Sequence, residues 1–372
     1  MRIVYVLTSL GMGGAERQVL ALANRMTERG HSVALMVLRP QLKQEWPTTL
    51  DVVHLEMRRN LVSLIAGLVR GHRFLKAFKP DVVHSHSFHA NVVARLLKVL
   101  VPAPAVLSTI HNVYEGGRGR MLTYRLTDWL SRLTTAVSTS AAERFVRLKA
   151  VPRHKCVVLT NGIDTAEFSP NAERRAQVRA AMDVGVREEF VWLTAGRIVP
   201  AKDFPNLLRA FGMVRAASPE ARLWVAGEAL DTQSNPVKSF VLGGSKGFMD
   251  CVRWLGLRRD IPALLDAADG FVLASAWEGM PLVVGEAMAM EKPVVATDVG
   301  GVRELVGDAG VIVPAGNSDA LAEAMLGLMG KSAEERQKLG SVARSRIATQ
   351  FSMDARADEW QALYLDVLSS AE

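Results

Sequence analysis

The chain alternates short apolar runs rich in β-branched residues with longer amphipathic stretches, and this pattern limits its fold more than any other feature. The short runs are typical of strands, and the longer stretches have the period of helices. Regular alternation of the two predicts parallel sheets with helices on both faces. In the first half we expect helices over 14–29 and 61–78, and strands over 2–9, 31–38, 81–86, 105–111 and 155–164, with another strand within 134–140.

The pattern restarts after a polar segment at 165–175. We expect further strands over 190–196, 221–227, 251–256, 270–275, 292–298 and 310–316. The expected helices are 203–215, 261–267, 282–290 and 319–330, then a helical region from 331 to the end that breaks near 350–352. Because 372 residues are about twice what one core serves, we predict two α/β domains in tandem with a boundary near 165–185.

Composition excludes several classes of protein. The best candidate for a membrane span, residues 61–69, has nine residues, whereas a spanning helix needs about 18 or more. The N-terminal stretch lacks a small-residue cleavage site, so we interpret it as a strand and not as a signal peptide. Cys156 and Cys251 are far apart and form no CxxC motif, which favours a reducing cytoplasm.

Charge is unevenly distributed along the chain. Residues 1–165 contain 23 Lys and Arg against 10 Asp and Glu, whereas residues 166–372 contain 22 against 28. All eight histidines also lie in the first part. Either these charges are solvated helix faces, or the first half meets an anionic partner such as a phosphate or an acidic membrane surface.

Ligands of open parallel sheets bind at the carboxyl ends of the strands. The first expected strand ends in a loop whose Gly13 and Gly14 allow the backbone to approach a ligand at a helix N-terminus. The loop is a poor dinucleotide fingerprint, because Glu16 stands at the place of the third glycine and Arg39 follows the second strand. A structural turn, and an NADP enzyme with Arg39 on the 2′-phosphate, stay open as alternatives.

Histidines follow two of the other strands. His84, His86 and His89 have a metal-like spacing but no nearby Cys or carboxylate, so we favour a ligand-lining role for His86. His111 and Asn112 end the strand 105–111. His111 is equally consistent with a hydrogen-bonded core residue, although its position at a strand end favours function.

A glycine and two cations stand at a strand-to-helix junction in the second half. Gly196 and Arg197 follow the strand 190–196, and Lys202 comes just before a helix. Arginine grips two oxygens and lysine adds a mobile charge, so the pair suits a diphosphate. The alternative is ordinary surface charge.

The stretch "EGMPLVVGE" carries two acids on either side of a helix start. Glu278 lies in the loop, Pro281 suits the first turn, and Glu286 lies about one turn inside the helix. Amides at a helix start attract phosphate, and carboxylates accept hydrogen bonds from sugar hydroxyls. This combination describes a sugar nucleotide, whereas attraction of acids to the helix start explains only one glutamate. The amides are those of Gly279, Met280, Leu282 and Val283.

Together with "GGAE" at 13–16, "NGID" at 161–164 and "KPVVATDVGGVREL" at 292–305, these motifs resemble the retaining GT-B glycosyltransferases of family GT4. The similarity covers essentially the whole chain. It implies an α/β fold of two Rossmann-like domains facing across a deep cleft. The domains are an acceptor-binding domain over 1–168, a nucleotide-sugar-binding domain over 185–350, and a C-terminal helix over 352–372 that crosses back onto the first.

The resemblance also implies roles for single residues. Arg197 and Lys202 would hold the diphosphate, Glu278 the donor sugar and Glu286 the ribose. With His111 beside the transferring carbon, the expected catalytic residues are Arg197, Lys202, Glu278 and His111. The expected donor-binding residues are Gly13, Gly14, Gly196, Arg197, Lys202, Glu278, Gly279, Met280, Leu282, Val283 and Glu286. The expected acceptor-side residues are Glu16, His86 and Asn112.

The implied reaction transfers a hexosyl unit from a UDP- or GDP-sugar to an acceptor hydroxyl with retained anomeric configuration. We expect no cofactor and no metal, because the cations and helix amides stabilise the leaving diphosphate. Segment 228–250 departs from the family pattern, which leaves the base open. A GT-B-shaped sugar-nucleotide 2-epimerase, an NADP-dependent oxidoreductase and a non-catalytic sugar-nucleotide-binding protein are the alternatives. Nucleic acid is not an expected partner.

Basic residues border two apolar stretches of the first half, around 61–78 and 118–132. Amphipathic basic helices lie on anionic lipid, and the resemblance places acceptors on this domain. We therefore expect a polyprenyl-diphosphate-linked saccharide acceptor in bacterial cell-surface polysaccharide or O-antigen assembly. The protein would be cytoplasmic and peripheral on the inner face of the plasma membrane, the alternative being a saccharide acceptor free in solution.

Overall fold

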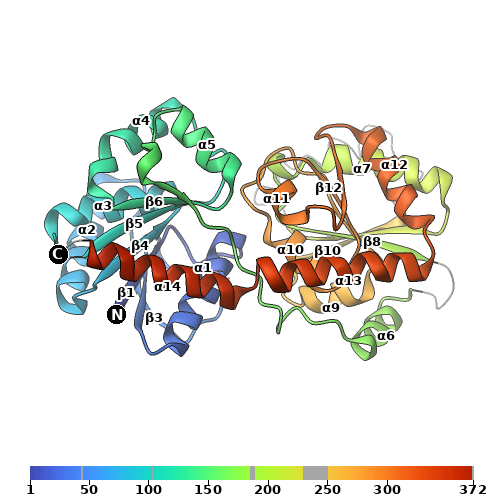
Figure 1. Ribbon diagram of the computed structural model, residues 1–372, viewed down its shortest axis with the longest axis horizontal. Coiled ribbons are helices and arrows are strands. Elements are labelled where there is room, and N and C mark those ends of the chain that lie inside the picture. Colours follow the sequence, from blue (N-terminus) through green and yellow to red (C-terminus); the bar gives the residue numbers. More distant parts are fainter. Residues whose placement is uncertain (43–44, 103, 185–188, 229–249, 371–372) are drawn as a thin grey trace. The chain divides into compact units, whose positions relative to one another are not determined.

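The computed structural model describes residues 1–42, 45–102, 104–184, 189–228 and 250–370 (Figure 1). The chain forms two compact units. Unit 1 comprises Met1–Gly162 and Met353–Glu372, and unit 2 comprises Ile163–Ser352. The chain passes from unit 1 to unit 2 between Gly162 and Ile163, ahead of the boundary expected near 165–185.

Unit 1 is built on a seven-stranded parallel sheet in the order β3-β2-β1-β4-β5-β6-β7. The inner strand β1 is buried from Ile3 to Leu7, as a strand covered by helices on both faces must be. The strands are β1 (Arg2–Leu7), β2 (Ser32–Val37), β3 (Asp51–His54), β4 (Val82–His86), β5 (Ala105–Ile110), β6 (Leu133–Ala136) and β7 (Cys156–Val158).

Helices cover both faces of this sheet (Figure 1). Alternate residues of β1 enter two cores: Val4 and Val6 pack with α2 and α3, whereas Tyr5 packs with α1 and the C-terminal helix α14. The last helix of the chain therefore belongs to the core of unit 1. The helices are α1 (Gly14–Glu28), α2 (Leu61–Phe78), α3 (Phe88–Leu100), α4 (Arg118–Thr127), η1 (Asp128–Leu130), α5 (Thr139–Arg147), η2 (Arg153–Lys155) and α14 (Met353–Ser369).

Unit 2 repeats the plan with a six-stranded parallel sheet in the order β10-β9-β8-β11-β12-β13. Its strands are β8 (Phe190–Ala195), β9 (Ala221–Ala226), β10 (Val252–Gly256), β11 (Gly270–Leu273), β12 (Val294–Thr297) and β13 (Val311–Val313). Its helices are α6 (Ala172–Ala181), η3 (Pro200–Lys202), α7 (Phe204–Ala217), α9 (Ile261–Ala267), α10 (Leu282–Ala289), α11 (Val302–Val306), α12 (Ser318–Met329) and α13 (Ala333–Gln350).

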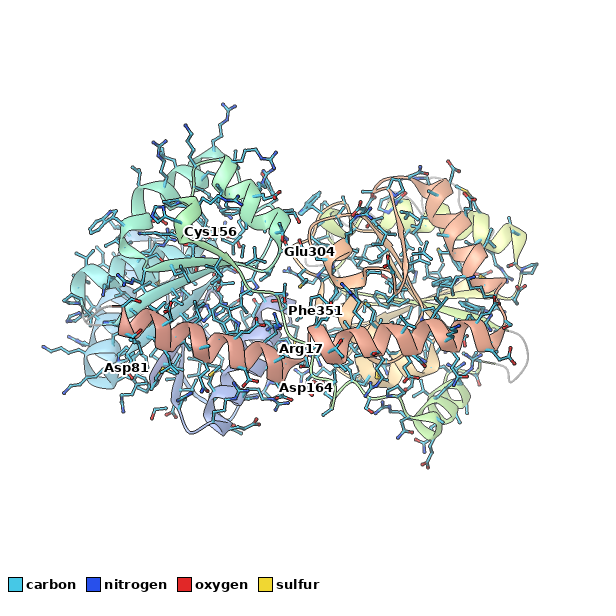
Figure 2. The ribbon with its side chains drawn as sticks, in the orientation of Figure 1. Arg17, Asp81, Cys156, Asp164, Glu304 and Phe351 are labelled. Carbon is cyan, nitrogen blue, oxygen red and sulfur yellow. The ribbon has the colours of Figure 1, made fainter. Side chains whose placement is uncertain are left out.

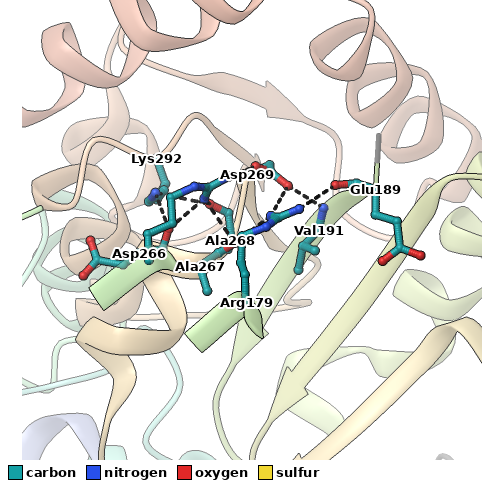
Figure 3. A network of polar contacts seen from close by, with 9 residues as sticks. Arg179, Glu189, Val191, Asp266, Ala267, Ala268, Asp269 and Lys292 are labelled. Carbon is teal, nitrogen blue, oxygen red and sulfur yellow. Dashed lines mark hydrogen bonds and ion pairs between the residues drawn. The ribbon is translucent and has the colours of Figure 1, made fainter. Parts of the chain in front are cut away.

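A polar network fastens α6 to the body of unit 2 (Figure 3). Arg179 donates to the Asp269 carboxylate at 3.1 Å and to the Glu189 carbonyl at 3.1 Å. Lys292 donates to the carbonyls of Asp266 and Ala268 at 3.1 and 3.2 Å. Burial lowers the pKa of Lys292 to about 8. These bonds satisfy the carbonyl ends of α9, which a helix leaves without internal partners.

Helix predictions agree with the structure most closely where caps or prolines delimit them. Helices 61–78 and 261–267 have the expected bounds, and the expected break near 350–352 separates α13 from α14. The prediction of one long strand over 155–164 was wrong, because β7 ends at Val158. Strand β3 was missed, because its four residues are only partly buried and lack the strong apolar signal of the other strands.

Candidate active site

Lys202 and Glu278 form the central ion pair of the predicted donor site. Lys202 ends η3, and Glu278 lies in the loop between β11 and α10. The Lys202 Nζ lies 2.6 Å from the Glu278 Oε1, which also accepts a hydrogen bond from the Ser275 hydroxyl at 2.6 Å. The side chains of Lys202 and Glu278 are 20% and 11% exposed. Such a pair holds both charged groups in place and stays accessible to a ligand with charge of its own.

The backbone around this pair is held by close contacts between loops. The Ala276 amide donates to the Ala201 carbonyl at 2.8 Å, and the Gly301 amide donates to the Gly279 carbonyl at 2.6 Å. Gly300 has a φ of +57°, and a Cβ there would lie 2.3 Å from the Glu278 carbonyl oxygen. Gly300 was not predicted as a site residue, although the "VGG" within the quoted motif was the available signal.

Arg197, the other predicted cation, has different surroundings. It follows Gly196, whose φ of +146° suits only glycine. The guanidinium is exposed and has no hydrogen-bond or ion-pair partner in the described part of the chain. The charge of Lys202 is thus neutralised by a neighbouring acid. The positive charge of Arg197, at the same strand-to-helix junction, is not neutralised by any acid in the described part of the chain. Gly227, also missed, supports this junction, because a Cβ there would lie 1.9 Å from the Gly196 carbonyl oxygen.

Helix α10 begins directly after the loop that carries Glu278. Pro281 is its N-cap residue and provides no side-chain cap for the first amides. Glu286 lies in the fifth position of the helix and is 6% exposed. Because this position is beyond the first turn, attraction to the helix start does not account for Glu286. The side chains of Met280 and Leu282 are buried, and that of Val283 is half-buried.

In unit 1, the loop that contains Gly13 leads into α1, and the Glu16 carboxylate lies beside Gly13. Gly13 is the N-cap residue and offers no side-chain cap. A Cβ at Gly13 would lie 2.2 Å from the Glu16 Oε2, and the Ser9 hydroxyl donates to the Glu16 Oε1 at 3.4 Å. Glu16 therefore occupies the start of its own helix. Gly14 is exposed as the first residue of that helix.

His86 and His111 meet at the carboxyl ends of two neighbouring strands. The His86 Nδ1 lies 2.9 Å from the His111 Nε2, and the ring centroids are 5.1 Å apart. Burial lowers the pKa of His86 well below its ordinary value, with further lowering by His84 and His111. Burial also lowers the pKa of His111 to about 4. Both rings are therefore neutral near pH 7, so His111 offers a hydrogen bond and not a positive charge.

His84 is a core residue. Its Nδ1 lies 2.7 Å from the Tyr364 hydroxyl and its Nε2 lies 2.6 Å from the Thr109 hydroxyl. Both ring nitrogens are occupied, so the metal-like spacing of His84, His86 and His89 does not form a metal site. Within the described residues, no three His, Cys, Asp or Glu side chains are placed to hold a metal ion. Metal independence of the reaction stays a prediction.

A small cavity of about 10 Å³ adjoins this pair of histidines. Its lining includes His86, His111, Gln18, Asn161 and Trp360, all from unit 1. The His86 Nε2 is buried and has no partner in the part of the chain that the structure describes. The cavity has room for about one water molecule, so it does not admit a sugar.

The loop after His111 contains a residue that we did not predict. The Glu115 carboxylate accepts a hydrogen bond from the His111 amide at 3.0 Å and another from the Tyr124 hydroxyl at 2.6 Å. Asn112, predicted on the acceptor side, accepts a hydrogen bond from the Tyr114 amide at 3.1 Å and so shapes the same loop. An acid in a polar loop gave no sequence signal for burial. Segment 228–250, whose departure from the family pattern leaves the nucleotide base open, lies largely outside the described residues.

Family profiles match both halves of the chain. The profile described as "Glycosyltransferase Family 4" matches residues 12–167, and the one described as "Glycosyl transferases group 1" matches residues 189–331. None of the helices in the described residues has the length and apolar character that crossing a bilayer requires.

Two relatives are similar to this chain over most of their lengths. A D-inositol 3-phosphate glycosyltransferase of Salinispora arenicola is 30% identical over 80% of this chain and 71% of its own. The Escherichia coli UDP-Gal:alpha-D-GlcNAc-diphosphoundecaprenol alpha-1,3-galactosyltransferase is 24% identical over 83% of this chain and 81% of its own.

A solved structure shares the fold over the whole chain. Anabaena Alr3699/HepE in complex with UDP-glucose has a TM-score of 0.86, with 21% identity and full coverage of both chains. This likeness supports the GT-B fold, and the profiles favour transfer over the epimerase and oxidoreductase alternatives. The chain belongs to the group 1 glycosyltransferases of family 4.

Proposed function

We propose that this glycosyltransferase transfers a hexosyl unit from a nucleotide diphosphate sugar to an acceptor hydroxyl and retains the anomeric configuration. The observation that carries the donor assignment is the 2.6 Å contact between Lys202 and Glu278 at the start of α10. A cation, a carboxylate and helix amides without a side-chain cap lie together there. The exposed Arg197 guanidinium lies on the same loop as Lys202, between β8 and α7. A diphosphate and sugar hydroxyls need these groups.

The leaving group of this reaction is a nucleoside diphosphate, whose β-phosphate gains negative charge in the transition state. Lys202, Arg197 and the first amides of α10 are the groups of unit 2 that would stabilise that charge. When the donor binds, the phosphate takes over the Lys202 ammonium as a partner. Glu278 then accepts hydrogen bonds from the sugar hydroxyls, with Ser275 still holding its Oε1.

The proposed role of Glu278 bears on how configuration is retained. A glycosidase-type double displacement needs a carboxylate nucleophile and a second carboxyl group about 5 Å away. Glu278 is already bonded to Lys202 and Ser275 through one oxygen. We therefore propose that it binds the donor sugar, and that the departing phosphate assists the acceptor on the same face.

The names of relatives suggest UDP as the nucleotide. The E. coli relative is described as using UDP-Gal, and the Anabaena structure holds UDP-glucose. We propose a UDP-sugar as donor, with a GDP-sugar as the alternative. Glu286 would bind the ribose hydroxyls.

The donor assignment is tested by incubating the protein with UDP-, GDP- and dTDP-sugars and measuring released nucleoside diphosphate, with and without a membrane lipid extract. We expect Lys202→Ala and Arg197→Ala to lower turnover at least about 100-fold, the cost of removing one transition-state donor. Arg258→Ala removes an exposed ion pair with Asp260 in the same unit and serves as the matched control. Unchanged turnover in both variants would remove the diphosphate assignment.

Exposed apolar side chains on unit 1 suggest a lipid-linked acceptor. Helix α3 contacts both α2 and α4, and these neighbouring helices with η1 carry a set of large exposed apolar side chains that we call the apolar surface. Val62 is 79% exposed and Trp129 is 72% exposed. The apolar surface comprises Leu61, Val62, Leu64, Ile65, Val69, Leu96, Val99, Leu100, Leu122, Leu126 and Trp129.

The charges around the apolar surface are almost all positive. Between residues 57 and 132 the sequence has three acids, Asp81, Glu115 and Asp128. Glu115 and Asp128 are buried, and Asp81 lies before β4, where it accepts a hydrogen bond from the Arg2 amide at 2.7 Å (Figure 2). Exposed apolar groups among basic ones favour an anionic membrane. The E. coli relative is described as acting on a diphosphoundecaprenol-linked sugar, and we propose a polyprenyl-diphosphate-linked saccharide as acceptor.

Co-sedimentation with vesicles of anionic or neutral lipid, at low and high salt, tests this surface. We expect the protein to bind anionic vesicles at low salt, and the double variant Val62→Ser, Ile65→Ser to bind at least about tenfold more weakly, because about 3 kcal/mol of apolar contact is removed. Leu365→Ser, at a 52% exposed position on α14, is the control. Equal binding of all three proteins, or no binding, would favour an acceptor free in solution.

A further inference from the structure

Glu115 is a buried acid that the proposed reaction does not yet use. It is 9% exposed and lies in the loop between β5 and α4. Its two carboxylate oxygens have separate partners: Oε1 accepts from the His111 amide at 3.0 Å, and Oε2 accepts from the Tyr124 hydroxyl at 2.6 Å. The carboxylate therefore ties the first residue after β5 to helix α4.

The partners of Glu115 are themselves held in place. Asn91 on α3 donates to the Tyr124 hydroxyl at 2.9 Å. Arg120 on α4 donates to the Glu115 carbonyl at 2.8 Å, and its guanidinium lies over the Phe88 ring, 4.7 Å from the centroid. Both ends of the Glu115 loop are thus attached to helices that pack on the sheet.

The imidazole of His111 is fixed from the other side by His86. Their ring nitrogens are 2.9 Å apart, and His86 is the last residue of β4. The His111 Nδ1 has no hydrogen-bond partner among the described residues. With its amide held by Glu115 and its Nε2 held by His86, the ring has one nitrogen left to meet a substrate.

We propose that Glu115 is a positioning residue for transfer, which acts through His111 by fixing the backbone that carries the imidazole. The inference rests on the proposed function and on the role that the family resemblance implies for His111, beside the transferring carbon. A displacement of about 1 Å at such a group lowers turnover by about two orders of magnitude. Removal of the Glu115 carboxylate frees the His111 amide, and the rest of the loop then no longer determines where the ring lies.

Ionisation of Glu115 adds a second readout. Burial raises its pKa to about 7, against the opposing effects of the hydrogen bonds from Tyr124 and His111 and of the nearby Arg120. The ionised carboxylate accepts both hydrogen bonds, whereas the protonated form must turn one oxygen into a donor. Turnover of the wild type should therefore fall as the pH drops through about 7. A glutamine at this position keeps the shape of the carboxylate and does not titrate.

The test compares Glu115→Ala, Glu115→Gln and Tyr124→Phe by steady-state release of nucleoside diphosphate from the donor that the wild type uses. Tyr124→Phe removes one bond of the carboxylate and leaves the His111 contact, so it is the control for loosening of the loop alone. We expect Glu115→Ala to lower kcat at least about tenfold with an unchanged donor KM. We expect Glu115→Gln and Tyr124→Phe to stay within about threefold of the wild type, and Glu115→Gln to lack the inflection near pH 7.

Three results would overturn the inference: wild-type kcat in Glu115→Ala, an equal loss in Tyr124→Phe, or an unchanged pH profile in Glu115→Gln. If Glu115→Ala does not fold, the pH profile of turnover in Glu115→Gln tests the inference by itself. Failure of the proposed function looks different, because the wild type itself would then release no nucleoside diphosphate from any sugar nucleotide.

Discussion

Gly300→Ala should displace the loop that carries Glu278. A Cβ at Gly300 would lie 2.3 Å from the Glu278 carbonyl oxygen and 2.7 Å from the Gly279 carbonyl oxygen. Ordinary van der Waals contact begins at 3.4 Å, so the loop must move by about 1 Å, the difference between 3.4 and 2.3 Å. The atoms that must move are backbone, and cannot swing away as the end of a flexible side chain does.

Gly316→Ala is the matched control for this variant. Gly316 also lies in unit 2 and also has a positive φ, +70° against +57° for Gly300, but a Cβ there would meet nothing within 4 Å. Both variants have the cost of a left-handed alanine, about 1–2 kcal/mol. Only Gly300→Ala adds overpacking, about 1–3 kcal/mol.

The two variants are compared by urea unfolding and by release of nucleoside diphosphate. We expect Gly300→Ala to lose about 2–5 kcal/mol of unfolding free energy, and Gly316→Ala about 1–2 kcal/mol. A shift of about 1 Å at Glu278 should also lower turnover about 100-fold, whereas Gly316→Ala should keep it. Equal losses of stability and of turnover in the two variants would refute the close approach of Gly300 to the Glu278 loop.

Three further variants test the cores and caps. The pKa of Lys292 is lowered to about 8, so between pH 8 and 10.5 the folded protein holds fewer protons than the unfolded chain. The free energy of unfolding of the wild type, measured in urea, should therefore rise by about 3 kcal/mol relative to that of Lys292→Met across that window. Parallel pH profiles of the two proteins would contradict this. Tyr364→Phe leaves the His84 Nδ1 without its partner at 2.7 Å and should cost about 1–3 kcal/mol in urea unfolding; no loss would show that the bond is unimportant. Ser332→Ala removes a capping box with Glu335 and should lower the free energy of unfolding, measured by thermal denaturation, by about 1 kcal/mol. No loss would indicate that the start of α13 is frayed in the wild type.

Local pattern was sufficient to predict most elements of both sheets. Buried parallel strands are nearly continuous apolar runs, so β1 and β8 could be located without knowledge of their neighbours. The strand β3 and the early end of β7 could not be located in this way. Both lie at an end of the seven-stranded sheet, where a strand has one neighbour and its sequence carries less apolar signal.

For the candidate site too, local pattern predicted individual residues but not the contacts between them. Strand ends followed by glycines and cations predicted Arg197 and Lys202, because topology brings the carboxyl ends of parallel strands to one edge. The same rule predicted His86 and His111 as site residues. It did not predict that their rings meet, which depends on the register that pairs His86 with Thr109 across β4 and β5.

The sequence by itself determined the two α/β units and the family, and it predicted which loops carry the candidate site. Only the tertiary structure showed that Lys202 is paired with Glu278, 76 residues away, and that the buried Glu115 accepts a hydrogen bond from the His111 amide. These facts depend on desolvation and on contacts between loops that are distant in the chain. The spacing of apolar residues, two in a strand and 3.6 in a helix, shows which face of an element is apolar. It does not show which polar groups meet when those faces are buried.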